Sequence, residues 1–237
     1  QKFNRTIKWD ACFPGAFIGS PEPALCGLFD KSLYETKTEV EYQHTSIWNP
    51  SFRTVSGARV RLDEFESESY NDGYSKNTNT SVFANGEVKF AKMLTLNVGG
   101  MYEEDNLNGS YFAPRLAFNL HLTDKDTLRL IYSEAIRSPD LYEQNGQLVF
   151  NIKNTRLPDG APQDDGILEY GTVESELDFE RIYSHEISYF GLYPSLSAQL
   201  DVKLFYDNLT GLISESLEHD KEITNSNQLH QSGIEGQ

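Results

Sequence analysis

The sequence predicts an all-β protein whose antiparallel strands follow one another as an up-and-down meander, forming part of a transmembrane β-barrel. Three observations lead to this prediction. Many segments alternate apolar and polar residues with a period of two, which is typical of strands with unlike faces. These segments run for about 9–12 residues, the length of a tilted strand that crosses a bilayer. Short turns alternate with long loops, as they do in outer-membrane barrels.

The alternation is clearest in SLSAQLDVKLFYDNL, residues 195–209, where every second residue from Leu196 to Tyr206 is apolar or aromatic. Similar segments come earlier in the chain. In order they are ETKTEVEYQHTSIW, FRTVSGARVRLDEF, SVFANGEVKF, LTLNVGGMYEE, FAPRLAFNLHL, TLRLIYSEAI and YSHEISYFGL. Together they predict about nine strands and the beginning of a tenth.

Each strand has a row of apolar residues and a row of polar residues, and the alternation alone does not determine which row faces water. In a soluble sheet the apolar row points into a core, whereas in an outer-membrane barrel it faces lipid and the polar row lines a hydrated interior. Charged residues such as Arg59, Arg129 and Lys203 stand in the middle of the polar rows, and a soluble sandwich could also carry these on its outer face. The strand lengths and the one-sided turns favour lipid for the apolar row. No run of about 18 apolar residues is present, so helical membrane spans are excluded.

The connections divide into two kinds, which predicts the ends of the barrel. Short turns fall at 49–51, 91–93, 123–126 and 193–195. Long, acidic loops fall near 10–35, 65–80, 137–181 and 208–225, and they are expected on the extracellular side. The whole chain, 1–237, is therefore expected to belong to a single barrel.

Charge and cysteine content limit the possible partners and compartments. The net charge of −16 argues against nucleic acid, because phosphate binding needs clusters of Lys and Arg. Cys12 and Cys26 flank a segment that contains Gly and Pro and is expected to be a loop. A disulfide between them would indicate an oxidising compartment such as the periplasm or cell surface. Two buried free thiols are the alternative.

Residues 110–237 resemble a known family. The stretch YFAPRLAFNLHLTDKDTLRLIYSEAIRSPDLYEQNG is similar to a hairpin of TonB-dependent outer-membrane receptors in which the second strand ends in Arg-x-Pro, here Arg137 to Pro139. LDFERIYSHEISYFGLYPSLSAQLDVKLFYDNLTGLIS is similar to a later hairpin of that family, and HQSGIEGQ resembles the start of the next strand. Residues 1–109 agree with the family by pattern and not by motif.

The resemblance implies a 22-stranded barrel, closed by an N-terminal plug domain, in the outer membrane of a Gram-negative bacterium. No plug-like segment, energy-coupling box or barrel-closing final strand is recognised, so the chain is expected to be an internal piece of the barrel. It implies import of a scarce nutrient, with a ferric siderophore as the first choice and TonB acting through the plug region. Membrane lipid and lipopolysaccharide are the expected surroundings.

The loops supply the candidate ligand contacts. The aromatic and basic residues expected to line the upper interior are Tyr70, Tyr74, Arg137, Tyr142 and Tyr170. Each has a plainer interpretation as a packing or girdle residue, and Arg137 could simply shape the strand exit. The histidines show no metal-ligand spacing, no catalytic set stands out, and neither an enzyme nor a resident cofactor is expected; the ligand itself would be an iron chelate.

Two further observations bear on the ligand. Receptors of this type that take haem carry a His after the Arg-x-Pro motif, and no His lies between Arg137 and Leu177, so haem is disfavoured. The loop 137–181 is strongly acidic. A strongly anionic catecholate chelate would prefer a vestibule lined by Arg and Lys, and a neutral or cationic hydroxamate-like chelate would be repelled less. The acidic residues could equally be a solvated surface that holds divalent ions near lipopolysaccharide.

Two other functions are consistent with part of the sequence. A soluble, secreted all-β binding protein such as an adhesin or lectin would share the alternation, the cysteine pair and the acidity, but it predicts shorter strands and long connections on both sides. A passive porin-like channel would share the barrel but would need no energy source. The motifs at 110–139 and 177–213 favour the receptor.

Overall fold

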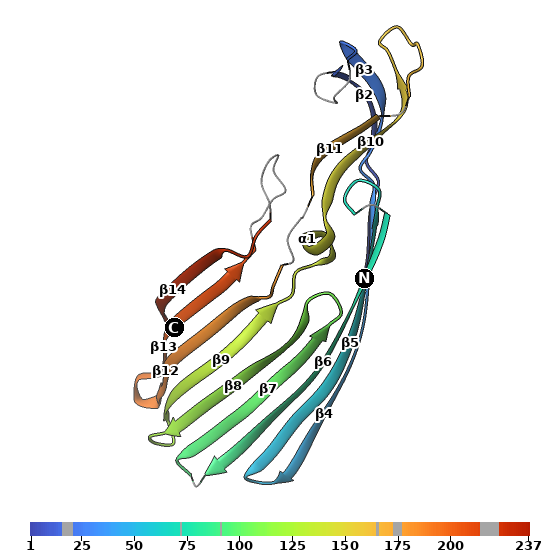
Figure 1. Ribbon diagram of the computed structural model, residues 1–237. Coiled ribbons are helices and arrows are strands. Elements are labelled where there is room, and N and C mark those ends of the chain that lie inside the picture. The colour runs from blue at the N-terminus through green and yellow to red at the C-terminus, as the bar shows by residue number, and fades with distance from the viewer. Residues whose placement is uncertain (16–20, 72, 91, 165, 173–176, 214–222) are drawn as a thin grey trace.

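Ten strands form one curved antiparallel sheet, here called the wall sheet, in a computed structural model that describes residues 1–15, 21–71, 73–90, 92–164, 166–172, 177–213 and 223–237 (Figure 1). The strands lie in the order β1-β4-β5-β6-β7-β8-β9-β12-β13-β14, which confirms the predicted meander. Their bounds are β1 Lys2–Arg5, β4 Leu33–Asn49, β5 Phe52–Ser67, β6 Gly73–Phe90, β7 Leu94–Asp105, β8 Gly109–His121, β9 Asp126–Arg137, β12 Glu180–Tyr193, β13 Ala198–Leu212 and β14 Asn227–Gly236.

The two faces of the wall sheet have an inverted distribution of polarity. Val98 is 50% exposed on the outer face, and Val40 is 70% exposed on the same face. On the concave face, Asn79 is fully buried and Asp105 is 2% exposed. A protein that keeps polar groups inside and apolar groups outside is arranged for lipid around it. The faces thus agree with the lipid-facing assignment of the apolar rows.

The short turns all lie at one end of the wall sheet, as Figure 1 shows at the bottom of the view. They connect β4 to β5, β6 to β7, β8 to β9 and β12 to β13. The last contains a short 3₁₀ helix, η2, at Pro194–Leu196, and Ser197 after it takes a left-handed conformation with φ 50°. Trp48 stacks on Phe52 at this end, with ring centroids 6.4 Å apart. No helix among the described residues is both long enough and apolar enough to span a membrane.

The predicted loop at 65–80 is wrong for most of its length, because β5 and β6 continue into it. The ladder between them extends to Ser67 and Gly73, so only residues 68–72 connect the two strands. After Val60 the strand no longer alternates regularly between apolar and polar residues, but hydrogen bonding between strand backbones does not require this alternation. Cross-strand pairs such as Glu66 with Tyr74 continue the register through this polar stretch.

The predicted loops 10–35 and 137–181 also contain regular structure. They supply β2 (Lys8–Pro14), β3 (Ala24–Asp30), β10 (Gln147–Arg156) and β11 (Gly166–Thr172), which form a second sheet in the order β11-β10-β3-β2. This sheet, here called the distal sheet, extends beyond the loop end of the wall sheet (Figure 1). It exists because β3 and β10 pair across a long sequence separation, with Phe29 opposite Ile152.

The distal sheet has a small core of its own. Phe29 and Ile152 are buried, and Trp9, Ala11 and Phe13 pack against them. Cys12 and Cys26 are paired in the β2–β3 ladder and form the predicted disulfide. Gly27 is required at its position, since a Cβ there would lie 2.4 Å from Ile152 Cγ2.

Candidate ligand-binding site

A short helix turns inward at the loop end of the wall sheet. Helix α1 covers Leu141–Asn145 and begins directly after the Arg-x-Pro motif. Asp140 caps it: its Oδ1 accepts a hydrogen bond from the Glu143 amide at 2.8 Å, and the Glu143 carboxylate accepts one from the Asp140 amide at 2.9 Å. This reciprocal capping box is what allows so short a helix to form.

Arg137 holds this helix to the wall sheet. Its guanidinium donates two hydrogen bonds to the Glu143 carboxylate, at 2.8 and 3.0 Å, and its Nε donates to Glu180 Oε2 at 2.5 Å. Glu180 in turn accepts a hydrogen bond from the Ile213 amide at 2.8 Å. Three segments that are far apart in sequence therefore meet at one arginine, and most of its donors are already engaged.

Further contacts fix the helix from its other sides. Ser138 donates a hydrogen bond to Glu103 Oε1 on β7 at 3.1 Å. Gln144 exchanges hydrogen bonds with the backbone of Leu177, at 3.0 and 3.1 Å. The Tyr142 ring packs against a buried cluster of Leu177, Ile213 and Ile223. The helix is thus a fixed part of the concave face.

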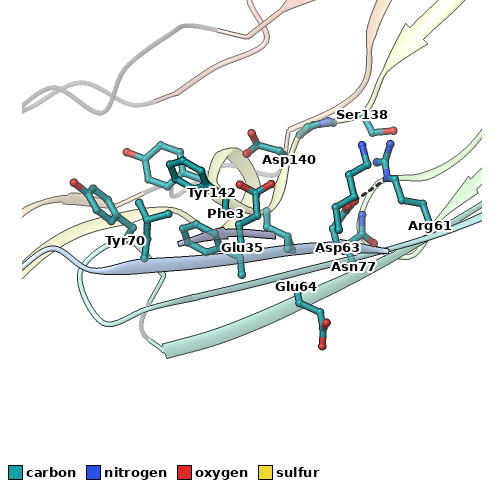
Figure 2. Close-up of a pocket in the computed structure, with 15 residues that line it drawn as sticks. Phe3, Glu35, Arg61, Asp63, Glu64, Tyr70, Asn77, Ser138, Asp140 and Tyr142 are labelled. Carbon is teal, nitrogen blue, oxygen red and sulfur yellow. Dashed lines mark hydrogen bonds and ion pairs between the residues drawn. The ribbon is translucent and has the colours of Figure 1, made fainter. Parts of the chain in front are cut away.

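A cavity of about 530 Å³ lies between this helix and the first strands of the wall sheet. Figure 2 shows that it has two unlike ends. Tyr70, Tyr142 and Phe3 gather at one end, here called the aromatic end. Arg61, Asp63, Asn77 and Ser138 stand at the other, with Glu35 and Asp140 between the two groups.

The charged side chains around the cavity differ in their partners. Arg61 donates to Asp63 at 2.8 Å. Glu64 points to the opposite side of the sheet from the other labelled side chains (Figure 2), and it accepts a hydrogen bond from the Tyr74 hydroxyl at 2.7 Å. Desolvation raises the pKa of Asp140 above its usual range, against the effect of the hydrogen bond from the Glu143 amide. Desolvation likewise raises the pKa of the Tyr142 hydroxyl, with smaller contributions from Tyr70 and Asp140.

The residues predicted as ligand contacts lie at different positions in the structure. Tyr70 and Tyr142 meet edge to face, with ring centroids 6.0 Å apart, and both line the cavity. Arg137 lies close by but is bound to Glu143 and Glu180. Tyr74 lies with Glu64 on the outer face. Tyr170 falls in β11, and its side chain lies outside the described part of the structure.

Several cavity residues were not predicted from the sequence. Phe3, Leu33 and Glu35 come from β1 and β4, and only their pairing with each other and with β5 brings them to the cavity. Asp140 could have been found, because Asp followed three residues later by Glu is the sequence pattern of a capped helix start.

A second cavity, of about 680 Å³, lies lower on the concave face and is mostly polar. It is lined by residues of β6 to β9, β12 and β13, including Glu87, Arg115, Asn119 and Arg129. His121 is held between the hydroxyls of Thr95 and Thr127, at 3.2 and 3.1 Å. Among the described residues, no group of three or more His, Cys, Asp or Glu side chains is arranged to hold a metal ion.

The sequence of residues 25–236 matches the family described as TonB dependent receptor-like, beta-barrel. This chain belongs to the TonB-dependent receptors. The wall sheet is accordingly a stretch of outer-membrane barrel, and the end with α1 and the distal sheet corresponds to the side of the long loops. A comparison with curated protein sequences finds no match.

Solved structures of such receptors share the fold at low sequence identity. The siderophore receptor PirA from Pseudomonas aeruginosa superposes with a TM-score of 0.69 at 12% identity, over 99% of this chain and 44% of that one. The Q482A mutant of the ferric enterobactin receptor PfeA from the same organism, in complex with enterobactin, gives a TM-score of 0.63 at 15% identity, over 92% of this chain and 34% of that one. The FrpB iron transporter from Neisseria meningitidis gives 0.64 at 11%, over 90% and 37%. This receptor chain thus spans less than half of each of these structures.

Proposed function

We propose that this chain is part of an outer-membrane receptor that binds a ferric siderophore and imports it with energy delivered through TonB. The observation that carries the proposal is the family match over residues 25–236. Structural neighbours named as siderophore receptors and as an iron transporter support iron as the nutrient. The cavity beneath α1 supports binding at the loop end, where a ligand arriving from outside would first meet the barrel.

Growth under iron limitation tests this proposal. A strain without the full-length gene is supplied with single purified siderophores as its only iron source. We expect growth to fail on at least one chelate and to be restored by the intact gene. Normal growth on every chelate would contradict a role in siderophore uptake and would direct the search to cobalamin, other metals or glycans.

A second complementing copy separates active import from passive flow. This copy lacks the segment that contacts TonB and keeps the barrel. We expect it to bind the chelate at the cell surface without restoring growth. Restored growth would instead indicate a passive channel, because a channel needs no connection to the inner membrane.

A further inference from the structure

We propose that the cavity beneath α1 receives a positively charged group of the ligand, such as a protonated amine or a guanidinium, at its aromatic end. This inference rests on the proposed function and adds the chemical class of the chelate: neutral or cationic overall, with a cationic arm.

The aromatic end offers the faces that a cation prefers. Tyr70 and Tyr142 stand edge to face at this end of the cavity, so the ring that contributes its edge has neither of its faces covered by the other tyrosine. A cation within about 6 Å of such a ring is attracted by its quadrupole, more strongly where water is excluded. Tyr142 is held in place by the Leu177, Ile213 and Ile223 cluster, so this surface is already formed before a ligand arrives.

Among the described residues, the carboxylates near this end form no ion pair, and Arg137 acts on Asp140 only from a longer distance. Within the described part of the chain, no basic side chain lies within 4.0 Å of the Glu35 or Asp140 carboxylates. The two basic residues that line the cavity belong to the other end. Arg61 is bonded to Asp63, and Lys37 is the cross-strand neighbour of the same aspartate. The electrostatic potential at the aromatic end is therefore negative.

A buried acceptor lines the opposite end of the same cavity. Asn77 is 4% exposed, and its Nδ2 donates to Asp105 at 2.8 Å. Its Oδ1 is buried and has no hydrogen-bond partner in the described part of the chain. A buried carbonyl without a donor is costly, and a ligand N–H that reaches it would relieve that cost. Carboxylates, π faces and a free carbonyl all favour a ligand that is cationic or donates hydrogen bonds.

The experiment compares two chelates that differ only in the charge of one arm. The probes are the ferric complex of desferrioxamine B, a linear trihydroxamate with a terminal ammonium, and the same complex with that amine acetylated. Dissociation constants are measured with the purified full-length receptor, and ferric enterobactin serves as the trianionic reference. We expect the ammonium form to bind about tenfold more tightly than the acetylated form.

Charge-neutral variants show whether the preference comes from this cavity. Asp140→Asn keeps the helix cap, since Asn caps as well as Asp, and Glu35→Gln keeps the side-chain shape. The double variant is expected to bind the two complexes with equal affinity. The matched control is Glu64→Gln, which removes a carboxylate from β5, the neighbour of β4, on the outer face, and it should keep the full preference.

The outcomes separate this inference from the proposed function. Equal affinity for the two complexes, an unchanged preference in the double variant, or binding of enterobactin alone would overturn the cationic site and leave siderophore import standing. The same holds if neither hydroxamate binds although another chelate supports growth. If no iron chelate supports receptor-dependent growth, the proposed function fails, and the charge assignment fails with it.

Discussion

The wall sheet and the distal sheet are built from the same kind of strand and bury opposite kinds of residue. In the wall sheet Val98 is half exposed while Asn79 is fully buried. In the distal sheet Phe29 and Ile152 are buried under Trp9 and Phe13. The difference indicates different solvents: the wall sheet has lipid on one side, and the distal sheet projects into water, where it needs a core.

The two sheets also differ in what holds them together. Most strands of the wall sheet pair with their nearest neighbours in sequence. The distal sheet joins two segments separated by most of the wall, and it adds the Cys12–Cys26 disulfide and an ion pair between Arg156 and Asp10 at 2.7 Å. A small sheet in water buries little apolar area, so it depends on such cross-links.

The largest effect is expected from a charge on the lipid-facing side of the wall. Val98→Lys should destabilise the folded barrel by up to about 4 kcal/mol, since a lysine near the bilayer midplane costs that much. The measurement is urea unfolding of the full-length receptor in lipid vesicles. Asn97→Lys, one residue away on the concave face beside the polar cavity, is the matched control and should cost about 1 kcal/mol or less. Equal costs would mean that the outer face is not in lipid.

Removal of the disulfide should weaken only the distal sheet. The double variant Cys12→Ser, Cys26→Ser removes the link between two residues that are 14 positions apart in the sequence. Chain entropy then predicts that the free energy of unfolding falls by about 3 kcal/mol. Hydrogen exchange should then quicken in β2, β3 and β10 and stay unchanged in β6 and β7. Reduction of the unmodified protein should give the same pattern. Faster exchange throughout the wall would contradict the independence of the two sheets.

Gly27→Ala should separate the two halves of the distal sheet. Its Cβ would lie 2.4 Å from Ile152 Cγ2 and 3.2 Å from the Lys153 carbonyl, and such overpacking costs about 2 kcal/mol. We expect protease cleavage in β10 to become faster. Gly86→Ala in the wall is the control, because there the nearest atoms are 3.6 Å and 3.8 Å away. If the two alanine variants are cleaved equally slowly, β3 and β10 do not pack as described.

The smallest effect is expected at Arg137. Arg137→Lys keeps the charge but cannot make the bidentate contact with Glu143, so α1 should loosen by about 1 kcal/mol, seen as faster amide exchange at 141–145. Arg53→Lys is the comparison, because Arg53 makes a single contact with Glu87 and is 59% exposed. A surface pair of that kind is expected to contribute less than about 0.5 kcal/mol.

The wall sheet could be predicted because its signal is local. Alternation such as that from Leu196 to Tyr206 determines the strand and its faces at once, and short turns determine the pairing. The distal sheet could not be predicted, because nothing near Phe29 indicates that Ile152 will lie opposite it. The same is true of the cavity: Tyr70 and Tyr142 were predicted as contacts, but Glu35 reaches them only through strand order. Local sequence patterns predict the individual strands and turns. Which distant segments pair with one another is seen only in the three-dimensional structure.

The pairing of β3 with β10 has a consequence for the order of folding. The contact between Phe29 and Ile152 encloses every strand from β4 to β9 in one chain loop. Closing so long a loop is entropically costly until the intervening strands are already side by side. The β2–β3 hairpin, tied by its disulfide, can form early and alone, but it must wait for the barrel wall before it meets β10. The outermost part of the molecule is therefore the last to be completed during assembly.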